Sequence, residues 1–437
     1  KLQEDALMSY VASVNYSYGD KYYASFSFRR DGSSRLSPDT RWGNFWSLSA
    51  SWRLSQEKFM QSLKSVLSDL KLRASYGVNG NLPSSYYGYQ STYTTGAFYN
   101  GKPSPWESTL GNEELTWEKN YALNLGLDIG LFSRVNVSLD WYTRTTKDLL
   151  MSKQLNSISG FSSLLTNVGQ MRNTGVELEV RSNNIKTKDF SWTTAFNLSH
   201  NKNKILKLAD LPWFVDGRYV RKEGYPFNTI YLREYAGVDP ETGSALYYDN
   251  QQDENGNYTK NKVTDPGQAS PIPLKDITPT ISGGFMNTFN YKFIDLSFNL
   301  SYSFGGYSYD NASYILQDDG YSVISNKSTE QRRRWQKPGD ITDVPRFVYG
   351  NKKGGNYNSS RAIHSTDHIR LKSLILGLNA PKAWLQKLGI GNARIYFSGT
   401  NLLTWAAYGQ YDPEMSGVVG FYTPPLKTYA FGLELKF

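Results

Sequence analysis

The stretch FIDLSFNLSYSF, residues 293–304, carries an apolar side chain at every even position and aspartate or a small polar residue at almost every odd one. Successive side chains of a β-strand point to opposite faces, so this period of two predicts a strand with one apolar and one polar surface. Two structures accommodate such a strand. In a soluble β-sandwich the apolar face packs into a core. In a membrane barrel it meets lipid, and the polar face lines an aqueous interior.

The same alternation recurs along the chain. YALNLGLDIGL (121–131) leads through FSR directly into VNVSLDW (135–141), which predicts a tight hairpin. Many of these segments reach the roughly 9–11 residues that a tilted membrane strand requires, and the 17 prolines lie outside them or at their edges. Thirteen strands are predicted, at about 6–18, 22–30, 44–54, 70–78, 117–130, 134–147, 167–181, 189–203, 280–290, 292–305, 366–379, 391–403 and 426–437.

The amino-acid composition excludes several classes of protein and of site. No run among the 437 residues approaches the roughly 20 apolar residues of a membrane helix, whereas alternation hides a barrel from such a search. The 33 Tyr and 11 Trp exceed what an ordinary core needs and favour membrane interfaces or ligand platforms. The absence of cysteine excludes disulfides and thiolate metal sites. The net charge of +9 is dispersed among nearly as many acids, so nucleic-acid binding is not predicted.

The predicted connections alternate between short and long, as the periplasmic turns and extracellular loops of outer-membrane barrels do. This parity favours the barrel. It requires 204–279 to be one loop, in which TIYLREYAGVD and SALYYDN form a local hairpin around PETG. Two short connections are predicted to be helical: SQEKFMQSLKSVLSDL, with Ser55 as N-cap, and NAPKAWLQKLGIG, which starts at Pro381 and ends at Gly389.

With these segments laid out, the chain resembles the SusC/RagA family of TonB-dependent outer-membrane transporters over essentially its whole length. The matching stretches follow one another in the order that the family has. They include FSFRRDGSSRLSPDTRWGNFWSLSASWRLSQEKFM, LKLRASYGVNGN, GNEELTWEKNYALNLGLDIGLF, DWYTRTTKDLL, NVGQMRNTGVELEV, FSWTTAFNLSHNKNKI, YAGVDPETG, RRRWQKPGDITDVPR, HIRLKSLILG and ARIYFSGTNLLTWAAYGQYDPE.

The resemblance implies an all-β, transmembrane antiparallel β-barrel of 22 strands in the outer membrane of a Gram-negative bacterium, surrounded by membrane lipid. Residues 1–437 are then the C-terminal part of a single barrel domain, and the N-terminal plug, the first strands and a signal peptide are expected outside this chain. The implied activity is import of an oligosaccharide or a peptide. The implied partners are a SusD-like surface lipoprotein that lids the mouth, and TonB with ExbB and ExbD through the absent N-terminal part. A dimer of such transporter and lipoprotein pairs is the higher-order assembly expected.

Aromatic side chains in the predicted long loops are the candidate ligand contacts. Flat rings beside small polar groups suit sugar C–H faces or peptide side chains, but they equally suit packing of a loop on itself or against the lid. The loop LPSSYYGYQSTYTTGAFYNGKPSPW contributes Tyr86, Tyr87, Tyr89, Tyr93, Phe98, Tyr99 and Trp106. The further candidates are Trp213, Tyr307, Tyr309 and Trp405.

No catalytic, cofactor or metal site is predicted. The pair His364 and His368 in HSTDH adjoins a strand, where residues four apart are too distant to chelate readily, and no nucleophile elbow of the G-x-S-x-G type is present. Two alternatives stay open from the residues alone. They are a soluble, secreted β-sandwich lectin or adhesin, and an outer-membrane barrel hydrolase. Extraction only by detergent would exclude the soluble one.

Overall fold

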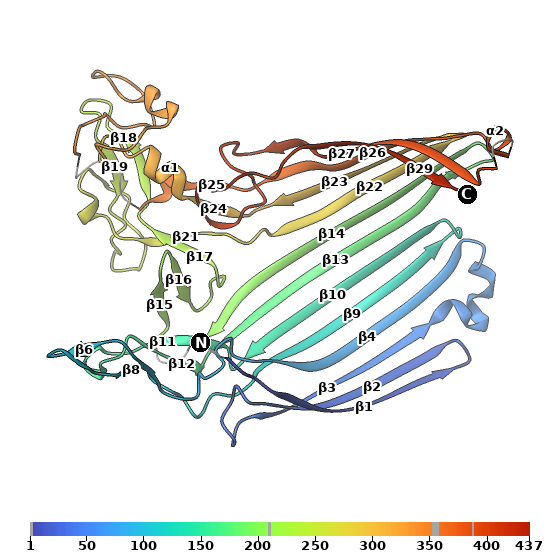
Figure 1. Ribbon diagram of the computed structural model, residues 1–437, viewed down its shortest axis with the longest axis horizontal. Helices are drawn as coiled ribbons and strands as arrows, with labels where there is room; N and C mark the ends of the chain where they lie inside the picture. The colour runs from blue at the N-terminus through green and yellow to red at the C-terminus, as the bar shows by residue number, and fades with distance from the viewer. Residues whose placement is uncertain (1–2, 209–210, 352–357, 387–388) are drawn as a thin grey trace. The chain divides into compact units, whose positions relative to one another are not determined.

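The computed structural model describes residues 3–208, 211–351, 358–386 and 389–437. It comprises two compact units, which are described separately. The first consists of Lys1–Lys186, Ser191–Trp213 and Lys222–Tyr225, and the second of Thr187–Phe190, Phe214–Arg221 and Pro226–Phe437. Each unit is built around a run of long strands that lie side by side (Figure 1).

The long strands of the first unit follow the chain order β1-β2-β3-β4-β9-β10-β13-β14. Each strand pairs antiparallel with the next, as in a meander. Their bounds are Leu7–Tyr18 (β1), Tyr22–Ser33 (β2), Trp42–Arg53 (β3), Leu67–Asn81 (β4), Glu118–Leu131 (β9), Val135–Lys147 (β10), Gln170–Lys186 (β13) and Phe190–Lys207 (β14).

The second unit has five long strands in the order β22-β23-β26-β27-β29, again antiparallel. Together with the eight of the first unit they stand at the thirteen predicted positions, so the strand prediction is confirmed. Their bounds are Ile281–Tyr291 (β22), Ile294–Phe304 (β23), His368–Asn379 (β26), Asn392–Ala406 (β27) and Thr428–Lys436 (β29).

Strand β23 contains residues 294–304 of the alternating stretch 293–304, and its register confirms the two faces. Leu296 lies between Phe289 of β22 and Leu376 of β26, which extends an apolar row across three strands. The neighbouring Ser297 pairs with Thr288 on the opposite face. Alternation in the sequence has therefore become one apolar and one polar surface of the sheet.

The apolar surface is exposed in both units. Leu48 of β3 is 53% exposed and Leu433 of β29 is 62% exposed, and several leucines beside them are similarly open. In a soluble sandwich these side chains would be buried under a second sheet. Their exposure instead fits a wall whose apolar face meets lipid. Among the described residues, no helix is both long and apolar enough to cross a membrane.

Tight turns and long connections occupy opposite ends of the strands. β1 and β2 are joined through Gly19 and Asp20, whose φ angles of 59° and 55° are typical of the primed turns that close hairpins. Residues 132–134 join β9 to β10, while 82–117 separate β4 from β9. Since consecutive strands are antiparallel, both tight turns lie at one end of the first unit and the long connection lies at the other. The predicted parity is confirmed within this unit.

The two helical predictions had different outcomes. Instead of an α-helix after Ser55, the chain forms two short 3₁₀ helices, η1 (Leu54–Gln56) and η2 (Lys58–Leu63). Ser55 is not an N-cap, because its buried hydroxyl donates to Asp69 Oδ1 of β4 at 2.7 Å and draws the segment onto the strand. The second prediction is confirmed in its start, since α2 (Lys382–Gln386) follows Pro381 directly. Gly389 has the left-handed φ of 67° expected of a terminating glycine. Residues 387–388 lie outside the described part.

Shorter elements decorate the long connections. Those of the first unit are β5 (Thr92–Thr94), β6 (Phe98–Tyr99), β7 (Lys102–Pro103), β8 (Trp106–Thr109), β11 (Leu150–Gln154), η3 (Ser157–Ser159) and β12 (Ser163–Asn167). Between Trp213 and Asp276 lie β15 (Trp213–Asp216), β16 (Tyr219–Lys222), β17 (Thr229–Leu232), β18 (Tyr235–Val238), β19 (Ala245–Tyr248), β20 (Lys262–Val263), η4 (Pro266–Gln268) and β21 (Ile272–Asp276). β18 and β19 pair antiparallel, which confirms the predicted local hairpin.

The later connections of the second unit carry the remaining elements. These are β24 (Tyr307–Asp310), α1 (Asn311–Leu316), η5 (Thr329–Arg333), η6 (Ser360–Ala362), β25 (Ile363–Ser365) and β28 (Gly417–Val419). Within this unit, α1, β24 and β25 lie at the end of the long strands away from α2 (Figure 1). That end is where the long connections gather.

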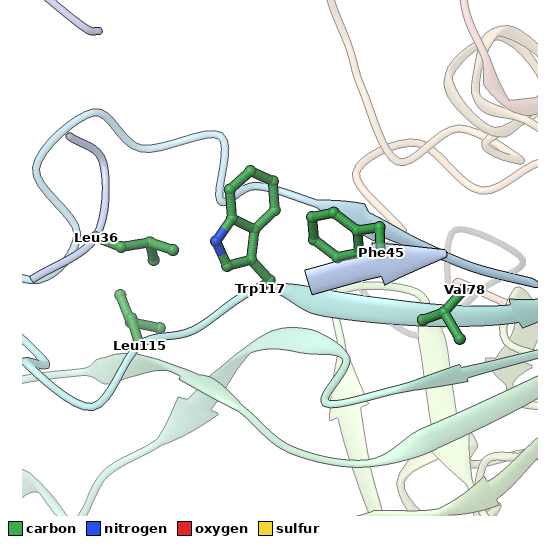
Figure 2. Packing of buried hydrophobic residues seen from close by; sticks show 5 residues of the cluster. All are labelled: Leu36, Phe45, Val78, Leu115 and Trp117. Carbon is green, nitrogen blue, oxygen red and sulfur yellow. The ribbon is translucent and has the colours of Figure 1, made fainter. Parts of the chain in front are cut away.

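A small core fixes the base of the long connection in the first unit. Figure 2 shows the indole of Trp117 beside the ring of Phe45, and their centroids are 5.1 Å apart in an edge-on arrangement. Leu36, Val78 and Leu115 complete this buried cluster. The Trp117 Nε1–H donates to the carbonyl oxygen of Arg41 at 2.9 Å, so its one polar atom is satisfied. The 82–117 connection therefore leaves the strands from a rigid base.

Candidate functional site

The polar face of the sheet carries ion pairs in which a side chain of one strand reaches over a glycine of the next strand to a side chain of the third. Arg73 of β4, Gly126 of β9 and Asp140 of β10 lie in one register row. The Arg73 guanidinium reaches over Gly126 to Asp140, with Nη2 and Oδ2 2.9 Å apart, and also binds Asp128 at 2.8 Å. A Cβ atom at position 126 would stand 2.5 Å from Arg73 Cζ. The glycine therefore makes room for the pair.

The second unit repeats this arrangement. Asp295 of β23 pairs in register with Gly377 of β26. Arg394 of the next strand, β27, reaches across to Asp295, with Nη2 and Oδ2 2.7 Å apart. A Cβ atom at position 377 would collide with both side chains. Two chemically similar bridges thus span three strands each.

A third bridge of this form is uncharged. Tyr142 of β10, Gly175 of β13 and Asn201 of β14 share one row, and the Tyr142 hydroxyl donates to Asn201 Oδ1 at 3.1 Å. Charged and hydrogen-bonding groups therefore line this face, while leucines line the other. Such a surface suits contact with water and polar solutes in a barrel interior.

The predicted aromatic loop forms an exposed flap at the long-connection end. We call residues 92–109 the aromatic flap. Its two small hairpins, β5–β8 and β6–β7, hold exposed rings on a short scaffold. Tyr99 is 79% exposed, and Trp106 is also largely exposed. The predicted residues Tyr93 and Phe98 are exposed in the same flap. These four rings are open to a solute or to a partner.

The three remaining tyrosines of the loop are engaged at its base. The Arg35 guanidinium lies over the Tyr86 ring at 4.2 Å from its centroid. The Tyr87 hydroxyl accepts from the backbone N–H of Glu4 at 3.1 Å. Tyr89 accepts a hydrogen bond from the side chain of its neighbour. Tyr86 and Tyr87 therefore contact residues outside the loop 82–106, and Tyr89 contacts Gln90 within it.

The other candidates are scattered. Trp213 begins β15 and is exposed. In the second unit, Tyr307 of β24 lies under the Lys275 ammonium at 5.0 Å from the ring centroid. Tyr309 is only 1% exposed, and its hydroxyl donates to Asn358 Oδ1 at 2.8 Å. Burial raises the pKa of Tyr309, which fits a core residue better than a ligand contact.

Trp405 lies on the apolar face of β27. It pairs in register with Ile369, whereas the adjacent Thr404 pairs with Arg370 on the polar face. Both Trp405 and Ile369 are exposed. An exposed tryptophan near the end of a lipid-facing strand is typical of the aromatic belt at a membrane interface. Trp405 therefore faces away from any solute on the polar side.

Sequence reasoning missed a pocket of about 600 Å³ at the long-connection end of the second unit. The residues that line it come from β24, α1 and the chain after α1, from the long strands β26 and β27, and from the connection after β27. The aromatic lining residues are Tyr408, Tyr411, Phe421 and Tyr422. The one signal in the sequence was this group of rings within the predicted loop 404–425. Trp405 was chosen from that loop, and its neighbours line the pocket.

Buried charges and stacked rings hold the pocket together. Arg370 binds Asp412 at 2.6 Å and Glu414 at 3.0 Å. The His364 ring stacks on Tyr408 with centroids 3.7 Å apart, and burial lowers the pKa of His364. Burial, followed by the nearby negative charge of Asp310, raises the pKa of Tyr408. The histidine and the tyrosine are therefore neutral near pH 7.

No metal chemistry is evident in residues 3–208, 211–351, 358–386 and 389–437. These residues contain no group of three or more His, Cys, Asp or Glu side chains that could hold a metal ion. The two histidines of HSTDH take separate roles. His364 stacks on Tyr408, which lines the pocket, and His368 Nδ1 lies 2.8 Å from the carbonyl oxygen of Thr366.

Residues 6–230 match the family model described as TonB dependent receptor-like, beta-barrel. The chain is 33% identical to TonB-dependent receptor P3 of Formosa agariphila, covering 100% of this chain and 46% of that protein. It is 30% identical to TonB-dependent receptor SusC of Bacteroides thetaiotaomicron, covering 99% of this chain and 44% of that protein.

Solved structures give the same result. The RagAB peptide transporter matches with a TM-score of 0.90 and 31% identity, over 99% of this chain and 48% of that one. The RagAB peptide importer in its closed-closed state matches with a TM-score of 0.88 and 32% identity, over 99% and 48%. The chain thus spans about half the length of the relatives that it matches. The SusC/RagA resemblance is confirmed, and the relatives named here are receptors and transporters.

Proposed function

Because this chain belongs to the TonB dependent receptor-like β-barrel family of the outer membrane, we propose that the protein imports an oligomeric nutrient across that membrane. The observation that carries the proposal is the pair of faces on the sheet. Exposed leucines on one face suit a wall embedded in lipid, and glycine-spanned ion pairs on the other suit an aqueous interior. The likeness to a peptide transporter and to SusC supports import of an oligomer, either a peptide or a glycan.

The chain supplies the barrel wall and the mouth in this proposal. TonB, with ExbB and ExbD, would act on a part of the protein outside the half that this chain spans. The exposed rings of the aromatic flap, with Tyr99 and Trp106 foremost, are the proposed first contacts for a ligand or for a SusD-like lipoprotein lid. Aromatic residues that are largely exposed on a short hairpin support a covering partner, because free apolar surface of this kind is usually an interaction site.

Deletion of the gene tests the import function. We expect the deletion strain to lose growth on one oligomeric nutrient from a panel of glycans and peptides, while growth on the matching monomer is unchanged. Restoring the full-length gene should restore growth only in cells with functional TonB. Undiminished growth of the deletion strain on every member of the panel would argue against import.

A variant of the flap tests the proposed contacts. Tyr99→Ala combined with Trp106→Ala removes two exposed rings without disturbing a core, so the protein should reach the outer membrane at normal levels. We expect slower uptake from this variant. The matched control is Trp384→Ala, which removes an exposed ring from α2 at the opposite end of the second unit's strands.

A further inference from the structure

We propose that residues 57–66 bind an anionic phospholipid of the periplasmic leaflet, with two lysines at the lipid phosphate and an acyl chain in an apolar hollow of the wall. We call residues 57–66 the rim segment. It belongs to the connection between β3 and β4, at the tight-turn end of the strands (Figure 1). In an outer-membrane barrel the short connections are periplasmic. The inference goes beyond import, because it concerns how the wall is held in its membrane.

Two sets of hydrogen bonds show that the chain crosses the end of the sheet where the rim segment begins. The Ser55 hydroxyl donates to Asp69, a residue of the polar face. Two residues later, the Glu57 carboxylate accepts from the Tyr22 hydroxyl at 2.6 Å and from the Trp52 Nε1–H at 3.1 Å. These two rings form a register pair on the apolar face. The helix η2 begins at the next residue and therefore on the lipid side of the wall.

The rim segment exposes large apolar side chains. Phe59 is 65% exposed, and Leu63 and Val66 are also exposed. Phe132 of the turn between β9 and β10 joins them, since its backbone N–H donates to the carbonyl oxygen of Val66 at 2.8 Å and its ring is exposed. Exposed apolar groups gathered in this way mark an interaction site. On the lipid side of the wall, insertion into the membrane interface continues the contact that the strands already make.

Two lysines accompany these apolar side chains. Lys58 and Lys64 are exposed, and within the described part of the chain neither forms an ion pair. Glu57 is the one acidic residue of the rim segment, and it is already paired with Lys21 at 2.9 Å. Two positive charges therefore remain. Lysines near a membrane surface attract anionic headgroups, and their long stems let the ammonium groups reach headgroup level beside inserted rings.

An open hollow of about 700 Å³ lies on the apolar face beside Trp52. Its lining is almost wholly apolar and includes leucines and the rings of Tyr22, Trp52 and Trp141. Ala50 and Ala74, which form a register pair, also line it and leave room that larger side chains would fill. A hollow of this size and composition on a lipid-facing surface suits part of an acyl chain.

The hollow lies close enough to the rim segment for one lipid to reach both. Trp52 lines the hollow and binds Glu57 of the rim segment. Ala50 is two residues from Trp52 along β3, which is about 7 Å at the usual rise of a strand. The hydrocarbon core of a bilayer is about 30 Å thick, so this distance stays within its periplasmic half. A headgroup at the lysines and a chain in the hollow can therefore belong to the same molecule.

An anionic phospholipid fits this site better than a zwitterionic one. Phosphatidylethanolamine carries an ammonium group near its phosphate, and the two lysines of the rim segment would repel it. Phosphatidylglycerol has the charge of the phosphate and no ammonium, so it meets no such penalty. A protein covering the rim segment would keep lipid away from it. The experiment distinguishes these occupants.

The test is local fluorescence quenching by lipid. Ser62→Cys places a label at an exposed position of η2, and bimane is attached there in the full-length transporter. This chain has no cysteine, and any elsewhere in the protein is replaced by serine. The protein is reconstituted into liposomes of phosphatidylethanolamine and phosphatidylglycerol, in which one lipid at a time carries brominated acyl chains. Brominated phosphatidylglycerol should quench with a relative affinity about fivefold or more above that of phosphatidylethanolamine, since one surface lysine contributes about that factor.

The charge of the rim segment is tested with a double variant. Lys58→Gln with Lys64→Gln should bring the ratio of the two lipid affinities close to one. The matched control is Lys186→Gln with Lys188→Gln, because these two exposed lysines lie at the tight turn between β13 and β14. The control should keep the ratio of the wild type. High salt should lower that ratio, since it screens the contact between ammonium and phosphate.

The hollow is tested by filling it. Ala74→Phe should weaken the affinity for both lipids about twofold, because a few lost van der Waals contacts suffice for that change. Ala12→Phe is the matched control, since Ala12 is exposed on the apolar face of the same unit, pairs with Phe28 and does not line the hollow. Both alanines are exposed, so both variants should fold.

Three outcomes would overturn the proposal. They are equal quenching by the two lipids in the wild type, an unchanged ratio in the lysine double variant, and no quenching by either lipid. The third would mean that the rim segment lies in water or under a protein. Full affinity in Ala74→Phe would overturn the assignment of the acyl chain to the hollow. Uptake by the same variants is measured separately, so a lost lipid preference with intact uptake leaves the proposed import function standing.

Discussion

Arg370 of β26 and Asp412 of the connection after β27 form a buried ion pair, with 2.6 Å between Nη2 and Oδ2. Removing one member of a buried pair leaves the other charge uncompensated. We expect Asp412→Ala to lower the free energy of unfolding by about 3 kcal/mol, near the low end of the usual range because Glu414 remains close to Arg370. Urea unfolding followed by tryptophan fluorescence in detergent measures this.

The control for this pair is an exposed one. Arg181 and Glu179 form an ion pair on β13 in which both side chains are well exposed. Exposed pairs contribute about 0–1 kcal/mol, so Glu179→Ala should have little effect. Equal losses from the two variants would show that the burial of Arg370 and Asp412 is irrelevant.

Adjacent positions on β23 distinguish lipid from water. Leu296 lies on the apolar face and Ser297 on the polar face. Leu296→Arg should disfavour membrane insertion by about 2–4 kcal/mol, the usual cost of arginine on a lipid face near the midplane. Ser297→Arg should be tolerated in an aqueous interior. The fraction that folds into liposomes, read from the heat-modifiable gel shift, measures both, and comparable loss from the two would contradict the assignment of faces.

Gly126 is required for the bridge between Arg73 and Asp140. A methyl group there would collide with the guanidinium, so Gly126→Ala should lower stability by about 1–3 kcal/mol, as overpacking commonly does. Gly409→Ala is the control, because open space surrounds that position and its φ is not left-handed. Thermal unfolding of both variants in detergent gives the comparison. If the bridge between Arg73 and Asp140 does not contribute to stability, Gly126→Ala and Gly409→Ala should unfold at the same temperature.

The loss of folding stability at acidic pH should depend on Glu57. Hydrogen bonds from the Tyr22 hydroxyl, Lys21 and Trp52 lower the pKa of Glu57 from 4.5 to about 2. A folded-state pKa below the unfolded one means that the stabilisation is complete above about pH 4.5 and is lost as the pH falls toward 2. The wild type should therefore lose more stability than Glu57→Gln between pH 5 and pH 2. Parallel curves for the two proteins would refute this role.

Two tryptophans of the same connection should behave differently. Trp106 is exposed in the aromatic flap, and Trp117 is buried in the core of Figure 2. Trp106→Ala should change stability by no more than about 0.5 kcal/mol and act on uptake. Trp117→Ala should cost about 3–5 kcal/mol, as large aromatic truncations in cores do. Unfolding curves and uptake rates are measured on both, and loss of stability from Trp106→Ala would mean that the flap packs against something in the free protein.

The wall strands could be predicted because alternation is a local property of the sequence. Each strand shows both of its faces in consecutive residues, so Leu296 and Ser297 reveal their sides without knowledge of any neighbour. The tight turn at Gly19 and Asp20 is local in the same way. The 3₁₀ segment after Ser55 was not predictable, because Asp69 captures the serine hydroxyl across a turn and competes with helical capping.

The pocket could not be predicted from local sequence patterns either, because residues distant in the sequence form it. Its lining combines α1, Arg370 and the connection after β27, which are dozens of residues apart and meet only through strand pairing. Trp405 was chosen as a candidate ligand contact from the sequence alone, without knowledge of the strand face on which it lies. β27 extends to Ala406, past the predicted end at 403, and this extension places Trp405 on the apolar side.

The glycine-spanned bridges also resist sliding between strands. Each bridge links two strands that share no backbone hydrogen bonds, so three neighbours behave mechanically as one ribbon. A slip of β9 by a single residue would replace Gly126 under Arg73 with a leucine from the opposite face. Tension applied to such a wall would therefore be resisted by side chains as well as by the backbone ladder.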